Sequence, residues 1–350
     1  MIRIAGRPIG QGHPAYVVAE LSANHHHDFD KAVSLVREAR RAGADAVKLQ
    51  TYTAETMTIR SDAPEFRIGA DSTWAGRVLY DLYDEAHMPW EWHDRLQQVA
   101  LREGIALFST PFDESSVDFL EALAMPAYKI ASFELVDTPL LEHVARTRKP
   151  VILSTGMASA DEIAEAVGTL RRGGCQDIVL LRCASAYPAQ AADVHLAAMR
   201  TLARDFGVEV GLSDHTMEPA VAVAAVALGA CVVEKHFTLD RSLGGPDASF
   251  SLEPAELTDL VRQIRVAEAA IGASADIPGV TRAEASNLAF RRSLYAVVDI
   301  AAGELFTRAN VRALRPAHGL APKHFADVLG KRAAAAIRRG TPLAWELVGR

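Results

Sequence analysis

The sequence has 350 residues, 49% of them hydrophobic and 23% charged, which is typical of a water-soluble protein with one large domain and one small domain. No run approaches the roughly 18 apolar residues of a membrane-spanning helix, and the first fifteen residues lack the apolar segment of a signal peptide. Cys175, Cys183 and Cys231 are scattered without metal-binding spacing, which indicates a reducing, cytoplasmic setting.

The net charge of −7 is divided unevenly along the chain. From Thr281 onwards there are 12 basic and 5 acidic residues, so the body is acidic and the tail is basic. A basic tail can bind nucleic acid, but these arginines are dispersed and form no Lys/Arg block. We therefore expect a module that docks on the body and helps to hold an anion.

Apolar, β-branched runs alternate with amphipathic helical patterns along the first 270 or so residues. The predicted strands are Tyr16–Glu20, Ala46–Gln50, Ile105–Ser109, Ala127–Ile130, Val151–Ser154, Ile178–Leu181, Val208–Gly211 and Cys231–Glu234. The predicted helices are Phe29–Ala42, Trp90–Glu103, Ser116–Leu123, Pro139–Arg146, Ala160–Arg172, Val194–Phe206, Pro219–Leu228 and Pro254–Ile271. Asp28, and Ser159 with Glu162 three residues on, are helix-capping signals. Eight strand–helix units predict a (β/α)8 TIM barrel, and the doubly wound alternative lacks a glycine-rich dinucleotide fingerprint.

Composition divides the rest of the chain. We expect the barrel at residues 1–272, a linker with a short helix (Thr281–Phe290) at 273–290, and a small mostly-β domain at 291–350. Within the barrel, the insertion Thr51–Pro89 is rich in aromatic residues and predicts a lid or substrate wall, or equally a structural flap.

Two histidines follow neighbouring strands near the end of the predicted barrel. His215 lies in Gly-Leu-Ser-Asp-His-Thr (211–216) and His236 in Glu-Lys-His-Phe-Thr-Leu-Asp (234–240). Because the ends of neighbouring parallel strands lie side by side, we expect the two imidazoles to converge. A lone loop histidine is more often an ordinary residue, but two at matching strand ends predict a divalent-metal site with open positions.

Lys48 and Lys129 also lie at predicted strand ends, with hydroxyl residues nearby. Ammonium and hydroxyl groups suit a phosphate, particularly beside the Gly156 turn that opens a helix. A Schiff-base lysine is the alternative, and the residues alone leave it open. The hydroxyl residues are Thr110, Ser132, Ser154 and Ser185, and the acid/base candidates are Glu20, Glu134, Glu234 and Asp247.

Together these motifs resemble the sialic acid synthase family over nearly the whole chain. The resemblance is carried by Ala-Glu-Leu-Ser-Ala-Asn-His (19–25), Ala-Val-Lys-Leu-Gln-Thr-Tyr (46–52), Phe-Ser-Thr-Pro-Phe-Asp (108–113), Tyr-Lys-Ile-Ala-Ser-Phe-Glu (128–134), Ser-Thr-Gly-Met (154–157) and the two histidine motifs. Leu-Ser-Ala-Asn-His and Gly-Gly-Pro-Asp-Ala-Ser-Phe-Ser-Leu-Glu-Pro (244–254) are most similar to the pseudaminic acid synthase branch. The C-terminal domain resembles the antifreeze-like (SAF) module, through Phe-Arg-Arg-Ser-Leu (290–294) and Leu-Arg-Pro (314–316).

The resemblance implies a transferase that condenses phosphoenolpyruvate with an open-chain N-acetylated amino sugar, with C–O cleavage and a divalent metal (Mn, Mg or Co). It implies that Glu134, Glu20, His236 and Lys129 lie at the reacting atoms, with Glu134 near the attacking water. It also implies a homodimer in which the SAF module caps the partner's barrel. By motif position, the implied metal ligands are His215 and His236; the implied phosphoenolpyruvate ligands are Lys48, Thr110, Lys129, Ser132, Ser154, Ser185 and Ser213; and the implied sugar ligands are Glu20, Gln50, Tyr187 and Asp247. Arg315 of the SAF module would enter the substrate site of the partner subunit.

His26 and His27 depart from the family pattern, which usually has polar residues after the first histidine. We interpret them as loop variation, and an additional metal site is the less favoured alternative. The rival hypotheses are a sister synthase that makes N-acetylneuraminate or legionaminate, a Schiff-base aldolase, and a non-catalytic carbohydrate-binding protein.

Overall fold

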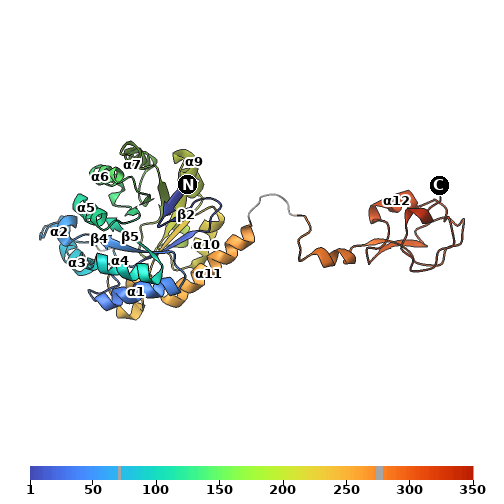
Figure 1. Cartoon of the computed structure of the whole chain (residues 1–350), viewed down its shortest axis with the longest axis horizontal. Helices are drawn as coiled ribbons and strands as arrows, with labels where there is room; N and C mark the ends of the chain where they lie inside the picture. Colours follow the sequence, from blue (N-terminus) through green and yellow to red (C-terminus); the bar gives the residue numbers. More distant parts are fainter. Residues whose placement is uncertain (70–71, 273–278, 350) are drawn as a thin grey trace. The chain divides into compact units, whose positions relative to one another are not determined.

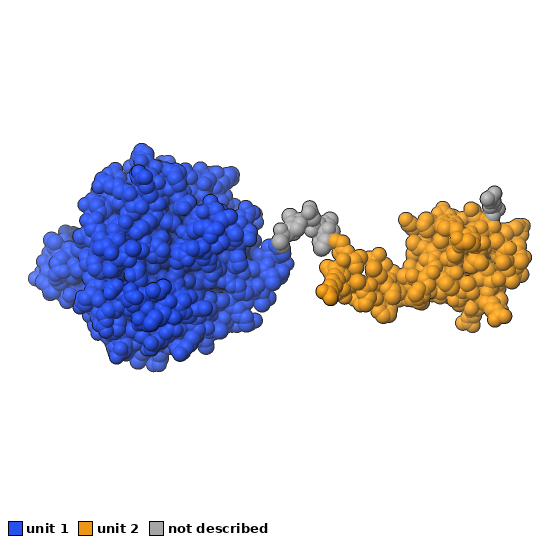
Figure 2. Space-filling view, in the orientation of Figure 1, with its two compact units in different colours: residues 1–273 blue, residues 274–350 orange. Residues whose placement is uncertain are grey.

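The computed structural model describes residues 1–69, 72–272 and 279–349, and the chain forms two compact units, residues 1–273 and 274–350 (Figure 2). Residues 273–278 of the predicted linker lie outside the described residues. Within the described ranges, every helix is too short or too polar to cross a membrane.

Eight parallel strands close the first unit into a barrel in the order β10-β3-β4-β5-β6-β7-β8-β9, with the helices around the outside (Figure 1). The predicted TIM barrel is therefore confirmed. The strands are β3 (Tyr16–Glu20), β4 (Ala46–Thr51), β5 (Ala106–Pro111), β6 (Tyr128–Ile130), β7 (Val151–Ser154), β8 (Ile178–Cys183), β9 (Glu209–Asp214) and β10 (Val232–His236).

The outer helices begin where the capping residues predict. The Asp28 side chain accepts hydrogen bonds from the first backbone N–H groups of α1, and Ser159 and Glu162 form a capping box on α7. The helices are α1 (Phe29–Arg41), α2 (Ala54–Met57), α3 (Leu79–Ala86), α4 (Trp92–Glu103), α5 (Glu114–Ala122), α6 (Thr138–Arg146), α7 (Ala160–Arg172), α8 (Ala191–Val194), α9 (Ala198–Phe206), α10 (Pro219–Ala227) and α11 (Pro254–Ile271).

The single predicted helix Val194–Phe206 is wrong. Residue His195 has a left-handed φ of 48°, which ends α8 at Val194, and α9 starts only at Ala198. An L-residue with this φ cannot continue a right-handed helix.

A short antiparallel hairpin at the N-terminus, β1 (Ile2–Ile4) and β2 (Arg7–Ile9), was not predicted. Its three-residue strands are too short to show a periodic pattern. Ile4 and Ile9 are buried in the same apolar cluster as Tyr16 and Phe108, so the hairpin packs on the barrel interior at the end where the strands begin.

The barrel interior changes from apolar to polar along each strand. Side chains alternate between the two faces, so Glu20 shares the inner face with the buried Tyr16 and Val18. On β10, Glu234 and His236 follow the buried Val232 in the same way. The strand ends therefore carry a layer of polar side chains directly above an apolar core.

The second unit has its own core. It contains an antiparallel pair, β11 (Ser293–Ala296) and β12 (Val311–Leu314), and a short helix α12 (Phe325–Val328). Leu294, Phe306 and Leu343 belong to its buried cluster. The predicted helix Thr281–Phe290 is only a 3-10 helix at Ala285–Phe290, which leaves its first four residues outside any helix.

Candidate active site

A buried charge network occupies the inner face of the barrel near the strand ends. Glu234 Oε1 lies 3.5 Å from Lys48 Nζ and 3.7 Å from Lys129 Nζ, and it accepts a 3.4 Å hydrogen bond from Ser213 Oγ. Lys48 also forms an ion pair with Glu20, its neighbour in register on β3, and donates to Thr110 Oγ1 at 3.1 Å. The two lysines, both glutamates and Thr110 are each at most 5% exposed.

The two lysines are not equivalent. Burial opposes charge on both, but Glu20 and Glu234 together raise the pKa of Lys48, whereas burial lowers the pKa of Lys129. Burial alone would raise the pKa of Glu234, yet the two ammonium groups hold it below its ordinary value. Sequence reasoning named Glu234 only as one of several acids. Its position two residues before His236, on the same face of β10, was the signal for its place in the network.

A second group of hydroxyls surrounds the turn after β7. Lys129 Nζ donates to Ser154 Oγ at 2.7 Å, and Gly156 N–H donates to Ser132 Oγ at 3.1 Å. A Cβ at Gly156 would lie 2.1 Å from Ser185 Oγ and 2.7 Å from Ser132 Oγ, so a side chain here would displace both serine hydroxyls. Lys129, the serines and the Gly156 turn thus form a cluster of polar groups of the kind that holds an oxyanion.

His215 and His236 lie side by side at the ends of β9 and β10, with ring centroids 5.3 Å apart. His215 Nδ1–H donates to the Ala184 carbonyl at 2.9 Å, which leaves Nε2 as the free acceptor. His236 Nδ1 lies 2.7 Å from Ser22 Oγ, which donates to Glu20 at 3.1 Å, so this network assigns the same tautomer to His236.

The two imidazoles fit a divalent metal. Each Nδ1 is held by a second partner, as is usual for metal-binding histidines, and burial and the neighbouring His215 lower the pKa of His236 so that its ring is neutral. Across the described ranges, no three His, Cys, Asp or Glu side chains gather to hold a metal. A metal here would therefore have two protein ligands and take its others from water or substrate.

Two loops cover the histidines. Tyr187 lies against His215, with ring centroids 4.4 Å apart, and Asp247 Oδ2 accepts a 3.2 Å hydrogen bond from Ala23 N. Burial raises the pKa of Asp247 to about 6. The 51–89 insertion ties the two loops together, because Thr73 Oγ1 donates to the Tyr187 carbonyl at 2.7 Å and Trp74 Nε1 donates to the Pro246 carbonyl at 2.8 Å.

Glu134 begins the short 3-10 turn after β6. It is largely buried, and its Oε2 has no hydrogen-bond partner among the described residues. Burial raises the pKa of Glu134 to about 7, so the carboxyl exchanges a proton near neutral pH.

The structure brings the predicted site residues of the barrel together near the strand ends. Gln50 and Arg315 need separate comment. Gln50 pairs in register with Thr110 on the polar layer, but the structure shows no side-chain hydrogen bond from it among the described residues. Arg315 is exposed on the second unit, after β12, so its place at a site stays a prediction.

The Glu134→Gln variant should be more stable than the parent above neutral pH. A carboxyl whose pKa is raised from 4.5 to about 7 holds its proton more tightly in the folded state, so the parent loses stability as pH rises through this window. The shift corresponds to roughly 3 kcal/mol. Urea unfolding at pH 5 and pH 8 checks this prediction. The increase in the free energy of unfolding caused by Glu134→Gln should be near its maximum at pH 8 and small at pH 5. A gain independent of pH would contradict the buried-carboxyl account.

Comparisons with known proteins agree with this geometry. The NeuB family pattern matches residues 35–276 and the SAF domain pattern matches residues 291–348. The pseudaminic acid synthase of Helicobacter pylori is 42% identical, covering 94% of this chain and 96% of that protein. The N,N'-diacetyllegionaminic acid synthase of Legionella pneumophila is 37% identical, covering 97% and 96% respectively.

A solved structure shares the fold. The N-acetylneuraminic acid synthetase of Leptospira borgpetersenii, crystallised in complex with citrate, superposes with a TM-score of 0.73 at 31% identity, covering 82% of this chain and 94% of that one. The resemblance to sialic acid synthases is thereby confirmed, and the chain belongs to the NeuB family, with an SAF domain at its C-terminal end.

Proposed function

We propose that this chain is a pseudaminic acid synthase. It condenses phosphoenolpyruvate, water and open-chain 2,4-diacetamido-2,4,6-trideoxy-L-altrose to give pseudaminate and phosphate. The observation that carries the proposal is the pairing of an oxyanion cradle at Lys129, Ser154 and Gly156 with two oriented histidines in one buried polar layer. Relatives named pseudaminic acid synthase, at 41–42% identity over 94% of the chain, support the choice of sugar.

The polar layer divides between the two substrates. The Gly156 side, with its ammonium and hydroxyl groups, suits the phosphate and carboxylate of phosphoenolpyruvate. The side next to the histidines suits a polyhydroxylated sugar, since carboxylates and a tyrosine hydroxyl accept and donate hydrogen bonds. We assign Lys48, Thr110, Lys129, Ser132, Ser154, Ser185 and Ser213 to phosphoenolpyruvate, and Glu20, Gln50, Tyr187 and Asp247 to the sugar.

His215 and His236 would hold the divalent cation, which is Mn, Mg or Co in this proposal. When bound there, the cation supplies Lewis-acid polarisation of the sugar aldehyde. The protein's own part is to present two oriented imidazoles: the Ala184 carbonyl fixes the ring of His215 and Ser22 fixes the ring of His236.

The reaction makes one carbon–carbon bond and breaks one carbon–oxygen bond. C3 of phosphoenolpyruvate attacks the aldehyde carbon, the aldehyde oxygen is protonated, and C2 becomes electron-poor. Water adds to C2 and gives up a proton, and the bond from C2 to the phosphate oxygen then breaks, which leaves the C2 ketone and inorganic phosphate. Glu134, with a pKa of about 7, is suited to take the proton from this water. The anionic charge beside C2 comes from the phosphate and from Glu134.

We propose that the SAF domain, residues 291–350, completes the site of a second subunit in a domain-swapped homodimer. The linker at 273–290 would allow this exchange with the barrel domain, residues 1–272. Arg315 is exposed on the second unit, and this basic part of the chain complements an acidic body. A cytoplasmic setting accords with the three buried free thiols.

A Schiff-base aldolase is the alternative from another class, and one observation favours it: burial lowers the pKa of Lys129, which activates an amine as a nucleophile. Borohydride with pyruvate would trap such an enzyme covalently, and chelator would leave it active. A synthase shows neither behaviour. N-acetylneuraminate and legionaminate synthases share the proposed chemistry and differ in the sugar.

Phosphate release from phosphoenolpyruvate in the presence of Mn tests the function. The panel holds N-acetylmannosamine, 2,4-diacetamido-2,4,6-trideoxy-mannose and the corresponding altrose isomer. We expect the altrose isomer to react faster by orders of magnitude, because each lost polar contact at a buried site costs a factor of about ten or more. Comparable rates of phosphate release with N-acetylmannosamine would contradict the proposed sugar substrate.

The His236→Ala variant tests the metal site. It should remain folded and lose measurable Mn binding in calorimetry, since one of the two protein ligands is removed. His143→Ala, on the outer helix α6, serves as the matched control and should bind Mn like the parent. Undiminished Mn binding by His236→Ala would contradict the proposal that His215 and His236 hold the metal.

A further inference from the structure

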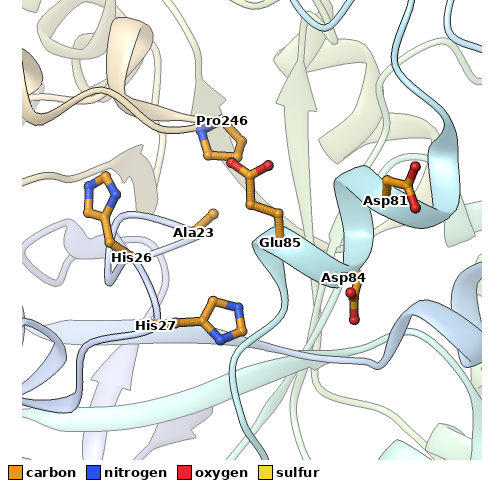
Figure 3. A pocket seen from close by; sticks show the side chains of 7 residues that line it. All are labelled: Ala23, His26, His27, Asp81, Asp84, Glu85 and Pro246. Carbon is orange, nitrogen blue, oxygen red and sulfur yellow. The ribbon is translucent and has the colours of Figure 1, made fainter.

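A cavity of about 500 Å³ lies at the rim of the barrel mouth, between the loop after β3, helix α3 and the Gly-Gly-Pro-Asp turn (Figure 3). His26 and His27 line it from the β3 loop, and Asp84 and Glu85 line it from α3. The cavity contains the two histidines that depart from the family pattern, and none of the roles assigned above uses it.

Two residues that line the cavity, Ala23 and Pro246, adjoin the proposed sugar ligand Asp247. Pro246, which lines it, immediately precedes Asp247, and Ala23, which also lines it, donates its backbone N–H to Asp247 at 3.2 Å. Ser22, the residue before Ala23, contacts His236. A sugar with its aldehyde carbon near His236 and its C2–C3 part at Asp247 would therefore direct carbons C4 to C6 towards this cavity.

The walls offer hydrogen-bond donors and acceptors that face one another. The His26 ring lies against Gly245, where a Cβ would come within 2.8 Å of it, and its Nε2 is buried without a hydrogen-bond partner among the described residues. Burial lowers the pKa of His26, so the ring is neutral and can donate one hydrogen bond. On the opposite wall, Glu85 forms an ion pair with Arg77 through Oε2, which leaves Oε1 to accept.

We propose that this cavity receives the C4–C6 part of the sugar chain, with the uncharged acylamino group on C4, and rejects a phosphate on C6. An acylamino group has one N–H and one carbonyl, which complement the carboxylate wall of α3 and the imidazole of His26. A phosphate would meet the carboxylates of Asp84 and Glu85 and be repelled. The inference rests on the proposed function and adds the part of the substrate that this chain selects.

Reduced, open-chain sugars test the inference, because an alditol has no aldehyde and cannot react. Their dissociation constants are measured by calorimetry on the full-length protein with Mn and phosphoenolpyruvate present. The ligands are the alditols of the 2,4-diacetamido-2,4,6-trideoxy altrose, of N-acetylmannosamine and of N-acetylmannosamine 6-phosphate.

The His26→Phe variant keeps a ring against Gly245 and removes its hydrogen bonds. It should raise the dissociation constant of the diacetamido alditol about tenfold and change that of the N-acetylmannosamine alditol less than twofold. His13→Phe, in the segment before β3 at the opposite end of the barrel, is the matched control and should change neither dissociation constant. An equal loss for both alditols would overturn the inference, because His26 would then act only by supporting the Asp247 turn.

The Asp84→Asn/Glu85→Gln double variant should bind the phosphorylated alditol at least fivefold more tightly and the neutral alditols within twofold of the parent. The control, Asp161→Asn/Glu165→Gln on the outer helix α7, removes the same charge elsewhere and should have no such effect. Unchanged phosphate affinity in the cavity variant would contradict the proposed rejection. Failure of the function itself looks different: the parent would then bind no alditol and release no phosphate with any sugar.

Discussion

One buried carboxylate, Glu234, balances the two lysines on which the phosphate half of the site depends. Lys48 and Lys129 come from β4 and β6, which are not neighbours in the barrel, yet both ammonium groups lie within 3.7 Å of Glu234 Oε1 on β10. An unpaired buried ammonium costs several kcal/mol, so this carboxylate helps to stabilise two lysines buried in the barrel. The shared charge also explains why the lysines differ: Lys48 has Glu20 as a second partner, and Lys129 has a serine and a backbone carbonyl.

The geometry of the barrel places this network under a mouth that opens at one end. The N-terminal hairpin packs on the apolar interior where the strands begin, and the polar groups of the inner face lie near the strand ends. Strand alternation then decides which side chains meet. Glu20 is the register neighbour of both Lys48 and His236, which joins the phosphate half of the site to the histidine half through one carboxylate and Ser22.

Much of this arrangement could be predicted from sequence, because strand ends of a barrel converge whatever the side chains are. Lys48, Lys129, His215 and His236 were located by that rule alone. The same alternation puts Glu234 on the inner face of β10 with His236, but it does not predict that Glu234 contacts both lysines, because pairing across the barrel depends on side-chain reach and not on spacing. The break at His195 depends on one backbone angle, and the cavity at His26 depends on how the long insertion folds back over the β3 loop.

The central claim is that phosphate held at Lys129 leaves with the oxygen that joined it to carbon. Phosphoenolpyruvate labelled with ¹⁸O at the oxygen between C2 and phosphorus tests this directly when turnover is followed by mass spectrometry. We expect the label to appear in the released inorganic phosphate and the sugar acid to carry oxygen from water at C2. Label retained at C2 of the sugar acid would mean P–O cleavage and would contradict the account.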